Sequence, residues 1–396
     1  MGVYVVDAPC GSGKTTAAID MINKSGQDDR FLFITPFLKE VVRIKEECSE
    51  KNFLEPQERG TKLNSIHWLI KNRKNIVSTH ALFLNFNDYT VELLKQKDYI
   101  LVLDEVIDLV DIMDVSEKDL ESILDRYAHV ENGFLVWDDL DYKGKFDDVM
   151  RIALNKCVGI YENYKLIWCF PIEIFKIFRE VHILTYMFKS QIQYYYYKLY
   201  DVGCVDRYVK DYKFTDEKQN YLSIIGKYKD LIDICDNSKL NSIGDREYAL
   251  SATWFWRDHF NGSPLMKVLK NNLGNYFKHI MGTPSKLNMW TTFKDYKSRL
   301  GGNGYTRGFV SVNARATNDY GHKTSLAYVA NIFMNPIVKN YFRINGIEID
   351  EERYALSEMI QWVWRSAIRG GKPISIYVPS KRMRELLISW LENENI

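Results

Sequence analysis

The stretch VYVVDAPCGSGKTT, residues 3–16, decides the fold of this chain. Four apolar residues lead into a glycine-rich turn, and Ala17-Ala18-Ile19 continue in a helical pattern. A buried strand before such a turn and a helix after it are the context that confirms a phosphate-binding loop. The turn fits A-x-x-G-x-G-K-T, in which Ala8 replaces the usual first glycine and leaves the phosphate-facing half intact.

The residue types in this loop suit a bound polyphosphate. Gly11 and Gly13 can adopt backbone angles that point successive N–H groups into one concavity, and the helix that opens at Lys14 adds its own unpaired N–H groups. Lys14 would reach the β- and γ-phosphates, and the Thr15 hydroxyl would ligate Mg²⁺. The alternative is a glycine-rich turn that binds nothing. The residues expected to bind the nucleotide are Ala8, Pro9, Cys10, Gly11, Ser12, Gly13, Lys14, Thr15 and Thr16.

Length and composition bound the remaining possibilities. The 396 residues allow two or three domains, and 46% hydrophobic with 27% charged residues is typical of a soluble globular protein. No apolar run approaches 18 residues and no signal-peptide pattern follows Met1, so we expect a cytoplasmic protein, in the host cytoplasm if viral, without membrane contact. Six cysteines without C-x-x-C spacing argue against zinc and disulfides. A net charge of +1 means that any basic track is local.

Polar residues follow the next two predicted strands. Phe31–Thr35 is apolar up to its final Thr35, and Asn75–Ser78 leads into Thr79. Open α/β sheets place ligand contacts at the carboxyl ends of strands, and hydroxyl groups suit contacts to a phosphate backbone. The candidates for nucleic-acid contact in these segments are Thr35, Pro36, Ser78, Thr79 and His80. Helix N-caps are the alternative for the three hydroxyl residues.

The strongest companion of the loop is Tyr99–Leu103, a buried strand from which Asp104 and Glu105 emerge. Asp104 can hold Mg²⁺ through water, and Glu105 can orient and deprotonate an attacking water. A pair of carboxylates placed only for solubility is the alternative.

Strands alternate with helices from residue 2 to about 186, which indicates a mostly parallel, doubly wound sheet. The acidic residues 108–148 read as an excursion over the surface, after which strand signals return at 165–171 and 180–186. The last of these strands ends at Thr185, which we expect beside the γ-phosphate.

The second half predicts another α/β domain. Strand signals lie at 193–200, 309–312, 326–333 and 374–378, with helical patterns at 358–369 and 381–391. We therefore predict two domains, residues 1–190 and 191–396. Basic residues interleave with aromatic ones at 276–307, which predicts a nucleic-acid track within the second domain; a solvated loop with aromatic anchors is the alternative.

Near the C-terminus, Gln361, Arg365 and Arg369 are spaced by four residues and would share one face of a helix. Two arginines and a glutamine suit the sensing and neutralisation of a γ-phosphate, as an arginine finger does. A polar surface stripe is the alternative.

Taken as an ordered set, these residues resemble the motifs of superfamily 2 helicases, closest to phage-encoded DEAD/DEAH-like members. The matching residues are 8–15 for motif I, 34–36 for motif Ia, 78–80 for motif Ib, 104–107 for motif II, 184–185 for motif III, 313–320 for motif V and 361–369 for motif VI. The resemblance implies two RecA-like domains with mostly parallel sheets, which close on ATP and Mg²⁺ while a single strand crosses both. It also adds Arg315 and Thr317 to the nucleic-acid contacts and makes Thr185 the coupling residue.

The chain departs from the family pattern in several places. Val106-Ile107 follow the Asp-Glu pair, so this is not a strict DEAD-box RNA helicase. No room precedes the first strand for an adenine-reading glutamine motif, which puts base selectivity in doubt. Motif III keeps only Thr185, and Trp364 stands where motif VI often has glycine.

The sequence thus predicts an ATP-dependent helicase or translocase, with Glu105, Gln361, Arg365 and Arg369 catalytic and Thr15 and Asp104 holding the metal. We expect a monomer that acts on single-stranded nucleic acid, DNA in preference to RNA, with replication or recombination proteins as further partners. The alternatives are an RNA helicase, a binding switch controlled by NTP, and a packaging or restriction motor. A packaging motor would need a nuclease with a cluster of carboxylates after the ATPase, and the sequence shows no convincing cluster of that kind.

Overall fold

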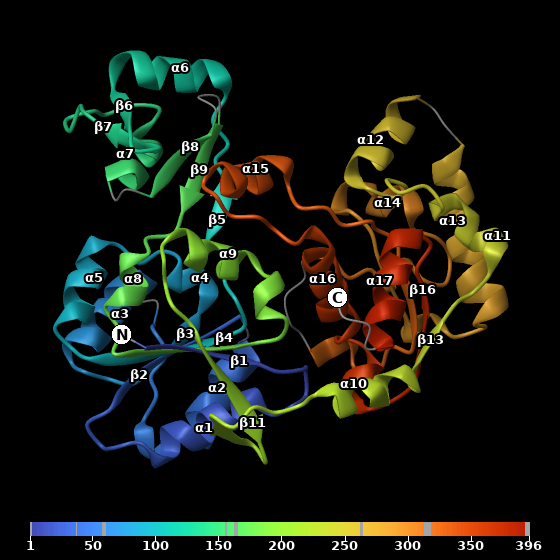
Figure 1. Ribbon diagram of the computed structural model, residues 1–396, viewed down its shortest axis with the longest axis horizontal. Helices are drawn as coiled ribbons and strands as arrows, with labels where there is room; N and C mark the ends of the chain where they lie inside the picture. Colours follow the sequence, from blue (N-terminus) through green and yellow to red (C-terminus); the bar gives the residue numbers. More distant parts are fainter. Residues whose placement is uncertain are drawn as a thin grey trace. The chain divides into compact units, whose positions relative to one another are not determined.

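The computed structural model describes residues 2–36, 38–57, 61–154, 157–161, 165–261, 264–312 and 318–392. Within these ranges the chain is a mixed α/β protein (Figure 1). It divides into two compact units, and each is discontinuous in sequence. The first contains Met1–Ala8, Ser12–Gln219 and Asn335–Ile349; the second contains Pro9–Gly11, Asn220–Met334 and Asp350–Ile396.

The first unit is built on a seven-stranded sheet in the order β12-β11-β1-β10-β4-β2-β3. Its strands are β1 (Gly2–Asp7), β2 (Arg30–Thr35), β3 (Ile76–Thr79), β4 (Tyr99–Asp104), β10 (Glu180–Thr185), β11 (Val205–Lys210) and β12 (Lys213–Thr215). Neighbouring strands pair in parallel except for β11 and β12, which form an antiparallel hairpin. The predicted doubly wound parallel sheet is confirmed. β11 and β12 lie beyond the domain boundary expected at residue 190, yet they extend the sheet that contains β1.

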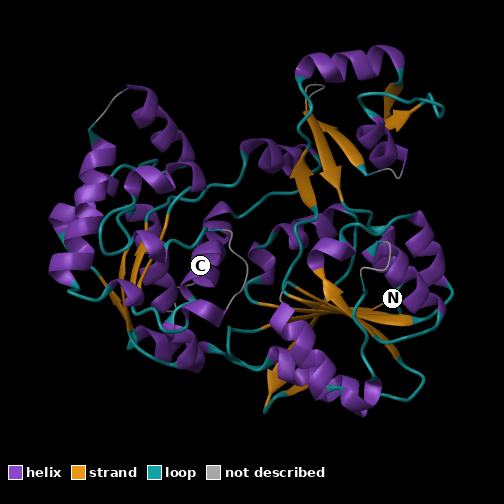
Figure 2. Cartoon of the chain, turned by 180° about the vertical axis from the view of Figure 1, so that it is seen from behind, coloured by secondary structure: helices purple, strands orange, loops and turns teal. Residues whose placement is uncertain are grey.

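Near-continuous apolar strands form this sheet because helices cover both of its faces. The helices of the unit are α1 (Lys14–Lys24), α2 (Leu38–Glu47), α3 (Lys62–Lys71), α4 (His80–Phe83), α5 (Asp88–Lys95), α8 (Glu173–Lys176) and α9 (Ile192–Leu199). Figure 2 shows helices on both sides of the strands. On one face Ala17 and Ala18 of α1 pack with Phe31 and Phe33 of β2 in a buried cluster. Truncating one such phenylalanine to alanine would cost about 3–5 kcal/mol.

Residues 193–200, predicted as an aromatic strand, instead form helix α9. The run of tyrosines favours a strand by propensity alone. However, the helical period places Gln193, Tyr196 and Tyr197 on a face that is buried against the unit. Tertiary packing therefore overrides local propensity here.

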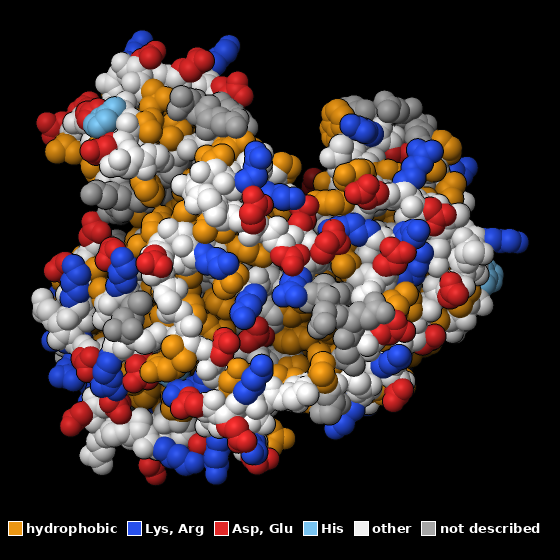
Figure 3. Space-filling model, viewed as in Figure 1, with side chains coloured by type: hydrophobic (Ala, Val, Ile, Leu, Met, Phe, Trp, Pro, Cys, Tyr) orange, Lys and Arg blue, Asp and Glu red, His pale blue; other side chains and the backbone are white. Residues whose placement is uncertain are grey.

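A separate antiparallel sheet is inserted between β4 and β10, in the order β5-β9-β8-β7-β6. It consists of β5 (Val110–Ile112), β6 (Ala128–Glu131), β7 (Phe134–Trp137), β8 (Val158–Tyr161) and β9 (Lys165–Cys169), with helices α6 (Glu117–Arg126) and α7 (Asp147–Leu154). The expected surface excursion thus has a core of its own, in which Leu120, Leu135 and Leu166 are buried together. Acidic and basic side chains both lie on its outer surface over α6 (Figure 3).

Helix α15 (Pro336–Ile344) belongs to the first unit although it lies far along the chain. The Tyr341 hydroxyl lies 3.7 Å from Cys169 Sγ of β9, and the Phe342 ring lies 6.3 Å from that of Tyr195 in α9. A Cβ added to Gly159 of β8 would come within 2.9 Å of the Tyr341 hydroxyl oxygen. Glycine at position 159 is therefore what lets α15 approach the inserted sheet.

The second unit contains a four-stranded parallel sheet in the order β13-β16-β15-β14. The strands are β13 (Ile232–Ile234), β14 (Asn288–Thr291), β15 (Ser325–Tyr328) and β16 (Ile374–Tyr377). The helices are α10 (Leu222–Lys229), α11 (Ser238–Asn241), α12 (Ala252–Asn261), α13 (Leu265–Asn275), α14 (Lys297–Leu300), α16 (Glu351–Val363) and α17 (Lys381–Leu391). The predicted strand at 309–312 is wrong, since Phe309 forms only an isolated bridge with Trp290.

The aromatic residues of the predicted track at 276–307 are mostly core residues. Tyr276, Trp290 and Tyr305 are at most 1% exposed and pack in one cluster. Buried rings cannot stack on a nucleic-acid base, so these three residues do not serve the stacking that the sequence suggested.

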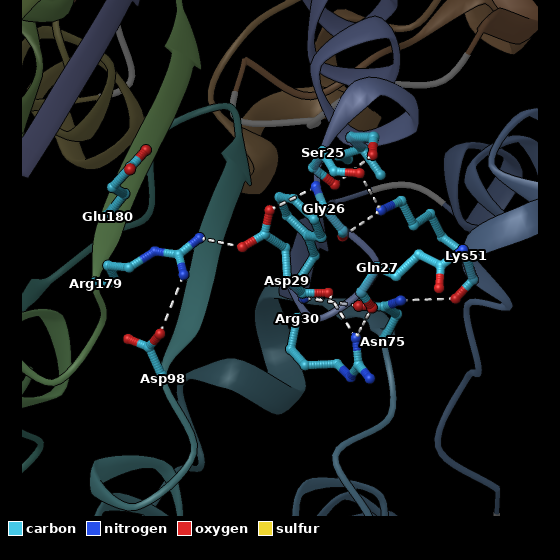
Figure 4. A network of polar contacts seen from close by, with 12 residues as sticks. Ser25, Gly26, Gln27, Asp29, Arg30, Lys51, Asn75, Asp98, Arg179 and Glu180 are labelled. Carbon is cyan, nitrogen blue, oxygen red and sulfur yellow. Dashed lines mark hydrogen bonds and ion pairs between the residues drawn. The ribbon is translucent and has the colours of Figure 1, made fainter.

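A polar network fixes the amino-terminal ends of the strands in the first unit (Figure 4). Arg179, just before β10, forms ion pairs with Asp29 at 2.6 Å and Asp98 at 3.1 Å, which precede β2 and β4. Lys51 Nζ donates to the Gly26 carbonyl over 2.8 Å. The candidate site lies at the other, carboxyl ends of these strands. This network therefore has a structural role away from the site.

Candidate active site

The loop between β1 and α1 has the backbone that a phosphate cradle needs. Gly11 and Gly13 lie in the left-handed region, with φ of 81° and 86°. Gly13 is also the N-cap of α1, so the first N–H groups of that helix open directly from the loop. Lys14 is 8% exposed, and its Nζ donates to the Ala8 carbonyl over 2.6 Å. The lysine is thus folded across the loop toward its first residue.

Asp104 lies at the carboxyl end of β4 between two threonine hydroxyls. Thr15 Oγ1 donates to Asp104 Oδ1 over 3.2 Å, and Thr35 Oγ1 donates to Oδ2 over 3.0 Å. Burial is the main reason that the pKa of Asp104 is raised to about 7, with Glu105 and Glu40 adding to the rise; the two threonine hydrogen bonds oppose it. A buried carboxyl of this kind is stabilised in its charged form by a nearby cation.

These oxygen atoms fit a magnesium ion. Mg²⁺ prefers oxygen ligands and is commonly held by one or two carboxylates together with substrate phosphates. Thr15 and Asp104 supply such oxygens beside the loop. Among the described residues no group of three or more His, Cys, Asp or Glu side chains could form an all-protein cage for a metal. Oxygen donors of the Thr15 and Asp104 kind suit a cation that is shared with a phosphate ligand.

Glu105 follows β4 in a strained conformation, with φ of 69°. A left-handed backbone at a residue other than glycine costs about 1–3 kcal/mol and persists where surrounding contacts enforce it. Here the Glu105 N–H donates to the Leu184 carbonyl over 2.8 Å, and Glu105 Oε2 accepts from Thr185 Oγ1 over 3.2 Å. The Thr185 carbonyl in turn accepts from the Ala8 N–H over 3.1 Å. Thr185 is therefore in contact with both the phosphate loop and the Asp-Glu turn.

The residues expected to touch nucleic acid in this unit are largely turned inward. Thr35, Ser78 and His80 are 0%, 3% and 8% exposed. Thr35 donates to Asp104, and His80 Nε2 lies 3.0 Å from the Asp104 carbonyl oxygen. The side chains of Thr35 and His80 thus support the Asp104 site. Thr79 is the N-cap of α4 but makes no side-chain cap hydrogen bond, and Pro36 is half-buried.

Two residues that were not among the predicted site residues also shape this site. The Asp7 carboxylate accepts from the N–H groups of Met187 and Phe188 over 2.7 and 2.8 Å, which fixes the chain after β10. Burial nevertheless raises the pKa of Asp7. Gln193 Oε1 accepts from the Ile107 N–H over 2.9 Å and so holds the loop that follows Glu105. The spacing of Gln193 and Tyr197 on a helix was the available signal, which the strand prediction concealed.

The motif near the C-terminus is not one continuous helix, contrary to expectation. Helix α16 ends at Val363, and Ala367–Gly370 form a separate 3₁₀ turn capped by Ser366. Gln361, Arg365 and Arg369 therefore do not share one helical face. Trp364 packs edge-on against Trp390, with ring centroids 5.8 Å apart, where the helix stops.

The two arginines have different surroundings. Arg365 is buried, at 7% exposed. Burial raises the pKa of the Tyr328 phenol, and the charge of Arg365 opposes that rise. Arg369 is exposed. Arg315 and Thr317, the remaining predicted contacts, lie outside the described residues.

Comparison with known proteins identifies relatives of this chain. A family model described as the YonV C-terminal Rossmann-like domain matches residues 226–391. The SPbeta prophage-derived uncharacterized protein YonV of Bacillus subtilis (strain 168) is 43% identical over 413 residues, covering 99% of both chains. No helix among the described residues is long and apolar enough to span a membrane.

Solved structures show a distant likeness in fold. Xpd4 from S. tokodaii matches with 13% identity and a TM-score of 0.49, covering 98% of this chain and 94% of that protein. The DUF1998 helicase MrfA, solved bound to DNA and AMPPNP, matches with 12% identity and a TM-score of 0.36, covering 99% of this chain and 48% of that one.

Proposed function

This chain belongs to the family of YonV, and on that premise we propose that it is a nucleoside triphosphatase driven by nucleic acid, which moves along a single strand of DNA. One observation carries the proposal: the phosphate loop, Asp104 and Glu105 meet at one edge of the first sheet, joined through Thr15 and Thr185. These are the groups that phosphoryl transfer requires, namely a phosphate cradle, a cation site and a base for water.

In this proposal the residues of the phosphate loop and of the neighbouring strand ends have defined roles. The N–H groups of 11–15 and the Lys14 ammonium bind the triphosphate, and Thr15 and Asp104 hold Mg²⁺. When bound, the cation neutralises charge that develops on the phosphate oxygens. Glu105 orients a water molecule and accepts its proton. Thr185 holds the Glu105 carboxylate in place through its hydroxyl.

The second unit is proposed to complete the reaction. Arg365 and Arg369 would neutralise the γ-phosphate, and Gln361 would help position the water. Arg365 follows the end of α16, and Arg369 lies in the separate 3₁₀ turn Ala367–Gly370. The two arginines would therefore act from separate positions and not from one helical face. Nucleotide-dependent changes in affinity for the strand would then drive movement.

The test is ATP hydrolysis by the full chain with and without single-stranded DNA or RNA, followed by strand displacement. We expect stimulation by DNA and a loss of at least a hundredfold in kcat for Glu105→Gln. Glu121→Gln, on the exposed side of α6, is the matched control and should hydrolyse ATP normally.

The outcomes separate the alternatives. Unchanged hydrolysis by Glu105→Gln refutes the assigned base. Stimulation by RNA alone indicates an RNA helicase. Stimulated hydrolysis without strand displacement indicates a binding switch, and hydrolysis that neither polymer stimulates counts against a nucleic-acid motor.

A further inference from the structure

The sheet edge beside the phosphate-loop strand is formed by a hairpin from later in the chain. β11 pairs in parallel with β1, with Tyr4 opposite Val205 and Val6 opposite Arg207. β12 then turns back antiparallel to β11. The hairpin runs next to α1, the helix that begins at the phosphate loop (Figure 1).

Contacts on the face that packs against α1 fix this hairpin in place. Val209 and Phe214 pack into the buried cluster that contains Ala17 and Ala18 of α1. The Arg207 guanidinium lies 4.4 Å from the centre of the Tyr4 ring. A cation over an aromatic face at this distance contributes about 0.5–1 kcal/mol when exposed. The tip of the hairpin is therefore held at a defined position relative to the loop.

The tip places an exposed tyrosine against the phosphate loop. Asp211 and Tyr212 form the turn, both in the left-handed region with φ of 49° and 60°. Tyr212 is 62% exposed, yet its ring lies against Gly13: a Cβ added to Gly13 would come within 2.3 Å of Tyr212 Cδ1 and 2.8 Å of Cε1. Only glycine at position 13 allows this contact. The ring thus borders the cradle on one side and is open to solvent on the other.

We propose that Tyr212 is the platform on which the base of a bound nucleoside triphosphate stacks. This inference rests on the proposed function of the phosphate loop and extends it from the phosphates to the base. An aromatic face attracts any nucleobase through stacking, which is worth about 1–3 kcal/mol per base and reads no hydrogen-bond pattern. The site would consequently take both ATP and GTP and favour them over pyrimidine nucleotides, whose smaller rings overlap less with the tyrosine.

The position of the ring indicates that it contacts the base of the bound nucleotide. The loop N–H groups bind phosphate, so the base of the same molecule must lie outside the cradle. Tyr212 borders the cradle at Gly13, the residue from which α1 opens. A tyrosine side chain is also stiff, with two rotatable bonds, so it provides contact area at a low cost in conformational entropy.

The experiment measures binding to the full chain by calorimetry with Mg²⁺ and three probes: a non-hydrolysable ATP analogue, its GTP counterpart and inorganic triphosphate. We expect Tyr212→Ala to weaken both nucleotides about tenfold and to leave inorganic triphosphate unchanged. Tyr212→Phe, which keeps the ring, should bind like the unmodified protein. Tyr248→Ala, at a tyrosine that is also 62% exposed but lies in the second unit, is the matched control.

Each other result overturns the inference in a distinct way. Equal weakening of inorganic triphosphate would assign Tyr212 to the shape of the loop, and tighter binding of all three probes would show that the ring covers the cradle. Unchanged nucleotide binding by Tyr212→Ala would exclude stacking. If the unmodified protein binds inorganic triphosphate as tightly as the nucleotides, the platform fails while the phosphate site stands. If it binds none of the probes, the proposed function fails as well.

Discussion

The Thr185 hydroxyl donates a 3.2 Å hydrogen bond to the Glu105 carboxylate, across two strands that are neighbours in the sheet. The same residue accepts the Ala8 N–H through its backbone carbonyl. A displacement of the phosphate loop would therefore be transmitted to the proposed catalytic base through a single, fully buried residue.

Removing the Thr185 hydroxyl should impair hydrolysis more than nucleotide binding. In Thr185→Val the backbone contact to Ala8 remains, but the Glu105 carboxylate loses its donor. We expect kcat to fall about tenfold or more with KM nearly unchanged, because positioning of a catalytic group acts mainly on the transition state. Steady-state ATPase kinetics test this, with Thr185→Ser as the variant that keeps the hydroxyl. Equal rates in Val and Ser variants would contradict the role.

Asp104→Asn should abolish the dependence of nucleotide affinity on Mg²⁺. The amide retains the shape of the side chain and can still meet Thr15 and Thr35, but it lacks the charge that attracts a divalent cation. Titration of the ATP analogue with and without Mg²⁺ measures the effect. A variant that still binds more tightly with Mg²⁺ would place the cation elsewhere.

Gln193→Met should loosen the loop after Glu105. The Ile107 N–H would lose its acceptor in a buried setting, which costs about 1–3 kcal/mol. We expect a lower midpoint of urea unfolding together with a reduced kcat. Gln96→Met, at an exposed position after α5, is the comparison and should change neither quantity. Full activity in the Gln193 variant would show that the loop is held by other contacts.

Arg179→Ala should lower stability in a manner that depends on pH. The Arg179 guanidinium holds the pKa of Asp29 below its ordinary value. A carboxyl whose pKa is lowered by folding contributes stability above its unfolded pKa, and this contribution is lost as the pH falls through the folded value. Because both side chains are partly exposed, the loss at pH 7 should be at most about 1 kcal/mol.

The difference between Arg179→Ala and the unmodified protein should therefore shrink below about pH 4. Denaturant unfolding across a pH series measures it. Lys24→Ala, which breaks an exposed pair with Asp20, should cost at most about 0.5 kcal/mol. A difference for Arg179→Ala that persists at pH 2 would mean that packing, and not charge, is responsible.

The N-terminal core of the fold was predictable because its signals are local. Apolar runs mark the strands at residues 3–6 and 99–103. The glycines and lysine of the loop and the Asp-Glu pair after the second strand mark the site. Helix α9 was not predictable from tyrosine propensity, since the buried face that selects a helix comes from distant residues. The end of α16 at Val363 has a similar cause: Trp364 packs against Trp390, 26 residues later.

The site was predictable in its chemistry but not in its supports. Residue types alone identified Lys14, Thr15 and Asp104 as candidates, and the structure brings them together. That Thr35 donates to Asp104 could not be foreseen, because a hydroxyl at a strand end serves equally well as a cap or as a ligand contact. Tyr212 lacked any sequence signal, since its importance derives from a hairpin that pairs with β1 about 200 residues away.

The placement of α15 has a consequence for dissecting this protein. Residues 335–349 leave the second unit, fill a position against Cys169 and Gly159 of the first, and return. A fragment that ends at residue 219 would therefore lack Tyr341 and Phe342 and expose the apolar surface that they cover. Neither unit is one uninterrupted stretch of the chain, so a single cut cannot release either of them whole.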